Sequence, residues 1–397
     1  MRVILLTGKG GVGKTTTAAA TGLHAARRGT KTLVLSTDPA HSLADALGVP
    51  VGAEPTEVEP GLFAQHADPR TRMDRAWQGV REYLLGVLDA VGVEPVAAEE
   101  LTVLPGVDDV LALLELRDQV RTGPWDLVVV DCGATAETLR LLALPESLSW
   151  YLDAAVPAER RIARAVRPVL ERAGGLPLPS EAVLGAVDRL RRELTDVHAV
   201  LTAPTTSVRV VLTPEAVAVA EARRTLTSLA LFGFAVDGVV VNRLVPDGAD
   251  PWRSAWARTQ AEQLSAVRAA VGSLPVVTGP YLPAEPVGVD ALADLAGRLY
   301  PGGAAAGDPL AVASVPPPVQ VQRDGQDFVL ELRLPDARGE DVDLARDGDD
   351  LVVTVGPYRR HLTLPSALRR CDVQGAALRK GVLGVRFRPD PALWRTW

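Results

Sequence analysis

The chain has 397 residues, of which 47% are hydrophobic and 23% charged, as in a globular protein large enough for more than one domain. Its net charge of −7 argues against binding of nucleic acid through a basic surface. The two cysteines, Cys132 and Cys371, are distant enough that they give neither a metal-site spacing nor a disulfide framework, although they could pair. No signal-peptide pattern and no long uncharged apolar run is present, so we expect a cytoplasmic protein.

The first 40 residues alternate strand, helix and strand. Residues 3–7 and 31–36 are apolar runs typical of buried strands, and 15–28 is helix-like. This order predicts an α/β fold with a mostly parallel, doubly wound sheet and helical insertions. Further strands are expected at 126–130, 209–212, 238–241 and 275–277, with helices at 214–231 and 290–299. The segments 53–116 and 145–200 are predicted to be mostly helical.

The composition changes after residue 300. Residues 301–320 have the small-residue and proline content of a linker. Beyond them, 328–334 alternates apolar and polar residues as a half-buried antiparallel strand does, and 351–355, 361–364 and 382–387 continue the pattern. We therefore expect a first domain at 1–300, a linker at 301–320 and a small all-β sandwich at 321–397.

A phosphate-binding loop follows the first strand. The letters GKGGVGKT at 8–15 fit G-x-x-x-x-G-K-[ST] between a strand and a helix, which is the context that supports such a loop. Glycines let backbone amides surround the phosphates, and the helix N-terminus adds partial positive charge. We expect Lys14 to reach the β- and γ-phosphates of ATP and Thr15 to bind Mg²⁺. The residues predicted to bind ATP in this loop are Gly8, Gly10, Gly11, Val12, Gly13, Lys14, Thr15 and Thr16.

Two carboxylates are expected beside this loop. Asp38 follows the second strand, at the carboxyl edge of the sheet where ligands bind in doubly wound folds, and is the candidate for orienting or deprotonating the attacking water. Asp131 follows the strand at 126–130 and is similar to a Walker-B aspartate, which acts on Mg²⁺ directly or through a water. Such aspartates are often only caps or turn residues, but the neighbouring phosphate loop favours a catalytic role.

Lys9 is a second lysine early in the phosphate loop, and the chain has only four lysines. A lysine here is typical of the deviant Walker A subgroup, in which it commonly contacts nucleotide bound to the opposite subunit. The alternative is a solvated surface lysine. Its place in a loop otherwise rich in glycine favours a catalytic role beside Lys14 and Asp38, and predicts a two-fold homodimer.

Over residues 1–300 the chain resembles the ArsA/GET-type ATPases, which include arsenite-pump ATPases and the tail-anchored-protein targeting factor. The matching segments are GKGGVGKTTTAAA at 8–20, STDPAHSLADALG at 36–48, VVVDCGATAETLRLLALP at 128–145, VVLTPEAVAVAEARRTLTSL at 210–229 and VVVNRL at 239–244. The resemblance implies that Asp38 is the switch I carboxylate and that 131–138 is switch II. It also implies that Asn242 reads the adenine and that Pro283 covers the base.

Departures from the family pattern bear on the expected ligands. Switch II is DCGATAET rather than D-T-A-P-T-G-H-T, and Ser42 stands where targeting factors often have Asn. The sequence contains neither the Cys-x-x-Cys pair that holds zinc at the targeting-factor dimer nor the cysteine cluster of arsenite sites. Met1 and Met73 are the only methionines, so a Met-rich client groove is missing. We therefore expect no structural zinc and no activation by arsenite.

The C-terminal strands resemble an α-crystallin (small heat-shock) domain. The matching segments are LRLPDARGEDVDLARDGDDLVVTVG at 332–356, RRHLTLP at 359–365 and AALRKGVLGVRF at 376–387. The resemblance implies an interaction or client-holding module, and a merely stabilising appendage is the alternative.

Three functions remain in view. The first is an ATP-driven homodimer that handles a protein or hydrophobic client, with the apolar stretch at 139–152 as core or as groove. An arsenite- or metal-pump ATPase would need thiolate ligands, and a ParA/MinD-like positioning ATPase would need a basic surface or a membrane-binding helix. The negative charge and the STDPAH motif favour the first, without nucleic acid as a partner. Membrane association stays open.

Overall fold

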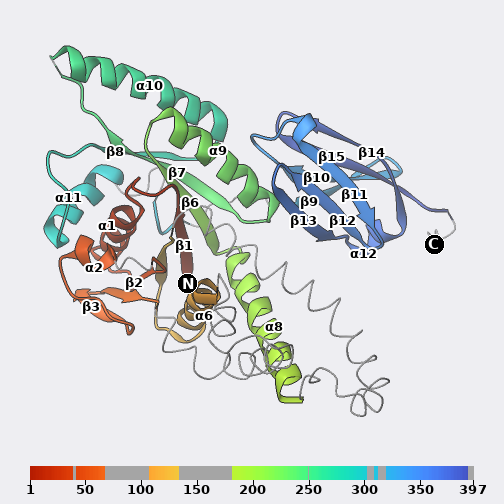
Figure 1. Ribbon diagram of the computed structural model, residues 1–397, viewed down its shortest axis with the longest axis horizontal. Coiled ribbons are helices and arrows are strands. Elements are labelled where there is room, and N and C mark those ends of the chain that lie inside the picture. The colour runs from red at the N-terminus through yellow and green to blue at the C-terminus, as the bar shows by residue number, and fades with distance from the viewer. Residues whose placement is uncertain are drawn as a thin grey trace, which may run out of the picture. The chain divides into compact units, whose positions relative to one another are not determined.

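The computed structural model describes residues 1–38, 42–67, 107–133, 181–248, 250–301, 308–311 and 319–391 (Figure 1). The chain divides into two compact units. The first contains Met1–His66, Pro124–Leu139 and Thr202–Trp397, and the second Ala67–Gly123 and Arg140–Leu201. In the second unit the described helices are α6 (Val107–Thr122) and α8 (Glu181–Leu201), which are joined by the ion pair between Arg121 and Asp196 at 2.7 Å.

An eight-stranded sheet forms the centre of the first unit, in the order β3-β4-β2-β5-β1-β6-β7-β8 (Figure 1). The strands are β1 (Arg2–Thr7), β2 (Thr32–Ser36), β3 (Thr56–Glu59), β4 (Leu62–His66), β5 (Leu127–Asp131), β6 (Thr206–Leu212), β7 (Val236–Leu244) and β8 (Val276–Pro280). Neighbouring strands are parallel except β3, which is antiparallel to β4. The central strand β1 is buried along its whole length. The predicted α/β fold is confirmed.

The prediction that 53–116 is mostly helical is wrong for β3 and β4. The turn between them contains Pro60 and Gly61, and Gly61 has φ +81°, which favours glycine. These strands are short, and β4 is held by parallel pairing with β2, a long-range contact that local periodicity does not reveal.

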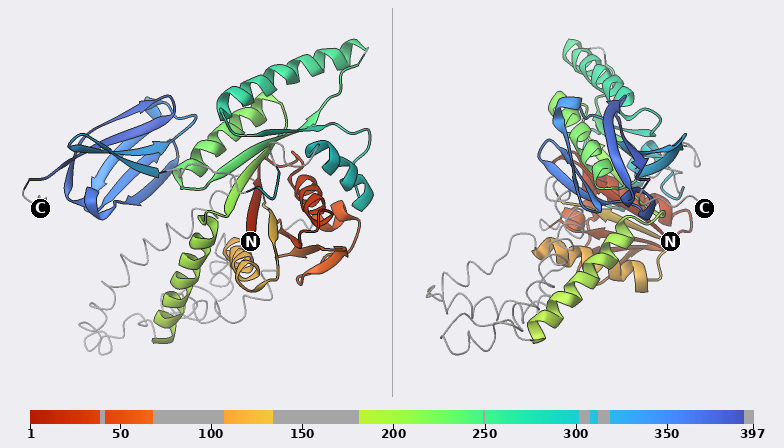
Figure 2. Two further views of the ribbon diagram at one scale, coloured as in Figure 1. Left: turned by 180° about the vertical axis from the view of Figure 1, so that it is seen from behind. Right: turned by 90° about the vertical axis from the view of Figure 1, so that its right-hand side faces the viewer.

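Helices cover both faces of the sheet. Helices α1 (Lys14–Ala26), α2 (Ser42–Leu47) and α11 (Val289–Leu299) pack together, while α9 (Ala216–Leu231) packs with α10 (Pro251–Val271) on the other face (Figures 1 and 2). The N-terminus of α10 is stabilised by a side-chain cap and a proline that are both visible in the sequence. The Asp250 side chain accepts a hydrogen bond from the Arg253 amide at 2.8 Å, and Pro251 occupies the first turn.

A buried ionic cluster joins the neighbouring strands β1, β6 and β7. Asp237 accepts hydrogen bonds from the guanidinium groups of Arg2, at 2.9 Å, and Arg209, at 2.7 and 3.1 Å. The Tyr300 hydroxyl lies 3.4 Å from Arg209 and 2.7 Å from Thr21. Desolvation by burial lowers the pKa of Arg209, but the charge of Asp237 outweighs this effect, so the pKa of this guanidinium is raised. For Arg2 desolvation is the largest effect, and its pKa is lowered.

The C-terminal strands form two antiparallel sheets, as predicted. One has the order β14-β15-β10-β9 and the other β11-β12-β13. The strands are β9 (Val319–Asp324), β10 (Asp327–Arg333), β11 (Val342–Asp347), β12 (Asp350–Val355), β13 (Tyr358–Thr363), β14 (Cys371–Arg379) and β15 (Val382–Pro389), with a short helix α12 (Ser366–Arg369). Leu332, Val353, Val385 and Phe387 fill the space between the sheets. We call residues 319–391 the sandwich.

Candidate nucleotide site

The loop at 8–13 links β1 to α1 and is shaped by its glycines. A Cβ on Gly8 would lie 2.0 Å from the Val211 carbonyl oxygen, and one on Gly13, at φ +91°, would lie 2.4 Å from Asn242 Nδ2. A larger residue therefore fits at neither position. A Cβ on Gly10 or Gly11 would meet nothing within 4 Å, so the outer side of the loop is open. An open backbone loop at a helix N-terminus fits phosphate oxygens.

The two lysines of this loop take different directions. Lys14 Nζ donates a hydrogen bond to the Lys9 carbonyl oxygen at 3.3 Å, so its side chain folds over the loop. Lys9 is half exposed, and its Nζ lies 3.9 Å from Glu221 Oε2 on α9. The Lys14 ammonium therefore lies over the loop, whereas the Lys9 ammonium lies toward α9.

Two serines link the predicted carboxylates to the loop. The Ser42 hydroxyl lies 3.0 Å from the Thr15 hydroxyl and donates to Asp38 Oδ2 at 3.2 Å. The Ser36 hydroxyl accepts from the Asp38 amide at 3.3 Å and donates to Asp131 Oδ2 at 3.2 Å. Ser36 and Asp131 are direct neighbours in the pairing of β2 with β5, which fixes this arrangement.

Asp131 is fully buried at the end of β5, and its Oδ1 has no hydrogen-bond partner among the described residues. Burial raises the pKa of this carboxyl to about 6, and the charge of Asp38 adds to the effect, while Thr15, Lys14 and Ser36 oppose it. A buried carboxylate with an unpartnered oxygen beside the Thr15 hydroxyl is a suitable donor set for a hard cation such as Mg²⁺.

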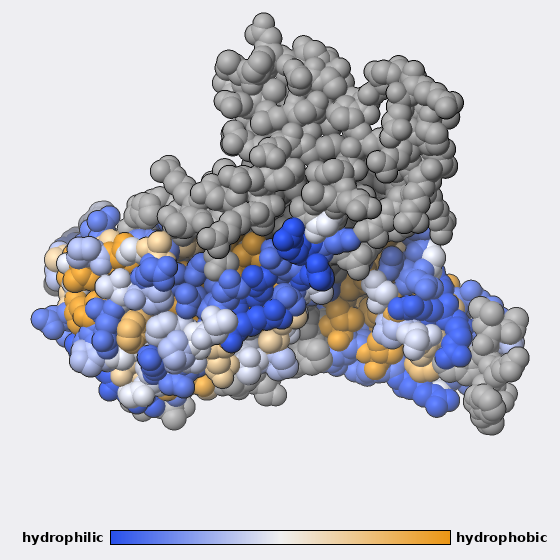
Figure 3. Space-filling view, turned by 90° about the horizontal axis from the view of Figure 1, so that it is seen from below, coloured by the Kyte–Doolittle hydropathy of each residue, from blue (hydrophilic) through white to orange (hydrophobic). Residues whose placement is uncertain are grey.

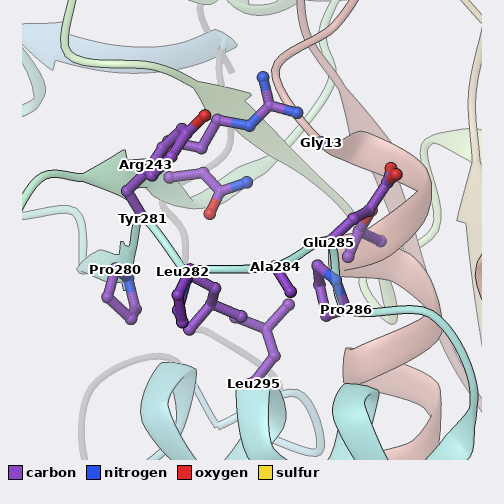
Figure 4. A pocket seen from close by; sticks show the side chains of 12 residues that line it. Gly13, Arg243, Pro280, Tyr281, Leu282, Ala284, Glu285, Pro286 and Leu295 are labelled. Carbon is purple, nitrogen blue, oxygen red and sulfur yellow. The ribbon is translucent and has the colours of Figure 1, made fainter.

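A cavity of about 340 Å³ adjoins the loop (Figure 4). Its lining residues are Gly13, Thr16, Asn242, Arg243, Pro280, Tyr281, Leu282, Pro283, Ala284, Glu285, Pro286 and Leu295. Figure 4 shows the chain at 280–286 running across the cavity, with Leu295 reaching in from α11 and Arg243 on the opposite side. The predicted base-site residues Asn242 and Pro283 therefore lie in one cavity with the predicted loop residues Gly13 and Thr16.

Asn242 also holds the phosphate loop in place. It is 7% exposed, and its Nδ2 donates to the Val12 carbonyl oxygen at 3.0 Å. On its other side, a Cβ on Gly279 would lie 2.8 Å from Asn242 Oδ1. The amide side chain is thus packed between Gly13 and Gly279, and it joins the phosphate loop to the cavity.

Several residues of the site were not predicted. Ser36 and Ser42 lie in the quoted STDPAHS segment, but their bridging role depends on strand pairing. Arg243 adopts φ 59°, an uncommon conformation for a residue with a side chain, and follows Asn242 directly. Only the first three residues of the predicted switch II, Asp131 to Gly133, are described. Residues 134–138 and the apolar stretch at 139–152 lie outside the described residues.

Within the described ranges, no group of three or more His, Cys, Asp or Glu side chains is arranged to hold a metal ion. Cys132 and Cys371 are both buried and unpaired with each other, and burial is the main cause that raises the pKa of each thiol. None of the helices in the described part of the chain is long and apolar enough to cross a membrane.

Similarities to known proteins show the family of this chain. Residues 1–301 match the family of anion-transporting ATPases named after ArsA, and residues 325–387 match the HSP20-like domain found in ArsA. An uncharacterized protein of Streptomyces coelicolor is 43% identical over 396 residues, 99% of each chain. A putative arsenical pump-driving ATPase of Prosthecochloris vibrioformis is 36% identical over 98% of this chain and 96% of its own.

Another relative matches about three quarters of this chain. ATPase ASNA1 homolog 1 of Paramecium tetraurelia is 27% identical over 300 residues, covering 74% of this chain and 90% of its own. The family model matches three quarters of the chain, and relatives match it over its full length. Together these matches show the family. The chain belongs to the ArsA family of ATPases and carries a C-terminal HSP20-like domain.

Proposed function

We propose that the chain is a Mg²⁺-dependent homodimeric ATPase in which ATP binding and hydrolysis open and close a surface for a protein or hydrophobic client. The observation that carries the proposed chemistry is the bridged group of Thr15, Asp38 and Asp131 beside the open phosphate loop. Hydroxyl and carboxylate groups converge there from three separate parts of the chain.

Each residue has a proposed role at this site. Lys14 would hold the β- and γ-phosphates, and the loop amides would surround them. Thr15 and Asp131 would hold Mg²⁺, Asp131 directly or through a water; the ion supplies positive charge that offsets the charge developing on the phosphate oxygens. The Ser42 hydroxyl donates to the Asp38 carboxylate, and the Asp38 amide donates to the Ser36 hydroxyl. Oriented by these two bonds, Asp38 would position or deprotonate the attacking water.

The cavity beside the loop is the proposed site for the base. Asn242 would contact the adenine and Pro283 would cover it. Arg243, whose guanidinium lies across the cavity from Leu282 in Figure 4, is a candidate for contact with the ribose or the base. Support comes from the position of this cavity, which shares Gly13 and Thr16 with the phosphate loop.

The proposed dimer rests on Lys9 and gains support from α10. The Lys9 side chain is half exposed, so it is accessible to a nucleotide in a second subunit. Helix α10 begins soon after the strand that carries Asn242, and it exposes two tryptophans one turn apart. Trp252 is 72% exposed and Trp256 38%. Large exposed aromatic side chains are enriched at interfaces between proteins, and an isologous contact uses the same patch on both copies.

The proposed client-handling role concerns the surface of the chain and its HSP20-like domain. On the face seen in Figure 3 the described surface is mainly hydrophilic, with hydrophobic residues in small groups. The apolar stretch at 139–152, which the sequence offers as core or as groove, falls outside the described residues. A client-holding role also agrees with the HSP20-like match at 325–387, a domain class that the resemblance above links to interaction with other proteins.

A pump-driving function is the second candidate, because a full-length relative carries that name. Arsenite would need thiolate ligands, whereas Cys132 is buried beside the nucleotide site and Cys371 lies in the core of the sandwich. Hydrolysis that increases several-fold on addition of arsenite would favour the pump-driving function over client handling.

Asp38→Asn tests the chemistry. We expect this variant to bind Mg-ATP normally but to hydrolyse it on the order of 10² times more slowly, because the substitution removes a group that positions or deprotonates the water. Lys14→Ala should instead weaken nucleotide binding. Asp45→Asn is the matched control, since Asp45 is exposed on α2 and the change is chemically the same. Normal turnover by Asp38→Asn would remove Asp38 from the mechanism.

Lys9→Ala tests the assembly. The variant should still bind nucleotide in each subunit, while hydrolysis is lost because the contact across the dimer is missing. Sedimentation of the unmodified chain with a nonhydrolysable ATP analogue should show a dimer that is weaker without the analogue, since a ligand that prefers one state shifts the population toward it. A monomer under both conditions, with a specific rate independent of protein concentration, would refute the dimer.

A further inference from the structure

Helix α9 contacts both the phosphate loop and the sandwich. Near its N-terminal end, Glu221 Oε2 lies 3.9 Å from Lys9 Nζ. The helix follows β6, whose Val211 carbonyl oxygen would clash with any side chain at Gly8. This end of α9 therefore lies beside the loop, and among the described residues it carries the one carboxylate that forms an ion pair with Lys9.

The C-terminal half of α9 packs against the sandwich. Leu231, its last residue, is fully buried and belongs to the hydrophobic core of the sandwich. The Arg360 guanidinium donates to the Leu231 carbonyl oxygen, and it lies so close to Gly233 that a Cβ there would be 3.1 Å from it. Phe232, which follows the helix, packs edge-on against Tyr358 with ring centroids 6.2 Å apart.

Polar contacts continue along the helix toward Glu221. The Asp336 amide donates to the Thr227 hydroxyl at 3.0 Å, and the Asp336 carboxylate forms an ion pair with Arg223. Arg223 is two residues from Glu221. One helix thus joins the Lys9 contact to the sandwich contact. Figure 2 shows the ribbon of this helix and that of the sandwich from two sides.

We propose that Glu221 is a positioning residue that holds Lys9 on its own subunit, and that the sandwich, by fixing α9, sets how readily Lys9 is released to act across the dimer. The proposal rests on the proposed dimer function of Lys9. Lys9 cannot pair with Glu221 and reach a second subunit at the same time, so the two contacts compete. Docking of the sandwich favours the contact within the subunit, because it keeps α9 beside the loop.

The expected size of the effect on dimer formation follows from the solvent exposure of the Lys9–Glu221 ion pair. The side chains of Lys9 and Glu221 are 48% and 30% exposed, so their contact is a surface ion pair. Such a pair changes an equilibrium constant by about 1.4-fold to 5-fold. Two pairs must break when two subunits associate, so their loss should strengthen dimer formation by about 2-fold to 30-fold.

The test measures the ATPase rate per subunit against protein concentration at saturating Mg-ATP, in the full-length chain. Glu221→Gln should lower the protein concentration for half-maximal rate by about 2-fold to 30-fold. Glu215→Gln is the matched control, because Glu215 is exposed at the start of the same helix and its side chain makes no capping hydrogen bond; it should leave that concentration unchanged. An unchanged concentration for Glu221→Gln, with Lys9→Ala inactive, would overturn the inference and leave the proposed function standing.

The role of the sandwich is tested in the same assay. Arg360→Ala and, separately, Arg223→Gln loosen its contact with α9 and should shift the half-maximal concentration in the same direction as Glu221→Gln. Arg359→Ala, at an exposed neighbouring position, should not. Combining Arg360→Ala with Glu221→Gln should add nothing, since both act on Lys9 release. Additive effects, or no effect of either loosening variant, would overturn the coupling. Full hydrolysis by Lys9→Ala would instead refute the proposed function.

Discussion

Asp131→Asn is expected to stabilise the nucleotide-free protein at neutral pH. The side chain is fully buried, and burial raises its pKa in the folded chain to about 6 from the usual 3.8. The folded state therefore holds the proton more tightly than the unfolded chain does. This contribution to stability is complete below pH 3.8 and is lost as the pH rises through about 6. Above that pH the ionised carboxylate costs about 3 kcal/mol, at about 1.4 kcal/mol per pH unit.

Urea unfolding of the nucleotide-free protein between pH 5 and pH 8 measures this effect. About half of the penalty is already present at pH 5, so the stability advantage of Asp131→Asn should grow by about 1.4 kcal/mol by pH 8. Asp126→Asn is the control, because it removes an exposed carboxylate next to the same strand. Saturating Mg-ATP should stabilise the unmodified chain more than the variant. An advantage that does not change with pH would refute the assigned burial penalty.

Three further predictions follow from the described contacts. Asp237→Asn should destabilise the fold by about 3–5 kcal/mol in urea unfolding, because Arg2 and Arg209 lose their buried counter-charge, whereas exposed Asp247→Asn should have little effect. Gly279→Ala should weaken ATP binding about tenfold by displacing Asn242, measured by titration calorimetry; Gly297→Ala, whose Cβ meets nothing within 4 Å, should not. A chain ending at Ala311 should hydrolyse ATP, while one ending at Gly303 should melt at a lower temperature, because Leu310 packs on the core and Asp308 pairs with Arg28. Equal melting temperatures for the two would contradict that last assignment.

The parts of the site that were predicted from sequence are those encoded by local patterns. The phosphate loop is a continuous segment in which glycines are needed because the backbone has no room for larger side chains. The sequence pattern alone therefore locates it. Asp38 and Asp131 follow apolar strands, and parallel strands bring their carboxyl ends to one edge. The expected role of Asn242 in reading the adenine was implied by family resemblance, since an asparagine at a strand end is otherwise an ordinary turn residue; the structure places this residue in the cavity beside the phosphate loop.

What the sequence did not predict depends on pairing between distant segments. Ser36 contacts Asp131 because β2 and β5 lie in register, which no local pattern of either strand specifies. Strands β9 and β14 are mostly exposed and lie at the edges of their sheet, so their sequences lack the alternation that identified β10 and β15. The segment at 308–311 looks like linker by composition, yet Leu310 packs against the first domain.

The position of Leu231 in the core of the sandwich has a consequence for the order of folding. The sandwich begins at Val319, so one residue of its core is synthesised almost ninety positions before its first strand. Domains fold in the order in which they leave the ribosome, and contacts of long sequence separation form late. The ATPase domain therefore offers α9 as a template on which the emerging β-strands complete their core. During synthesis the dependence runs in one direction: α9 can pack on β6, β7 and α10 before the sandwich exists, whereas the sandwich completes its core only on a folded ATPase domain. Once folded, the sandwich in turn restrains α9.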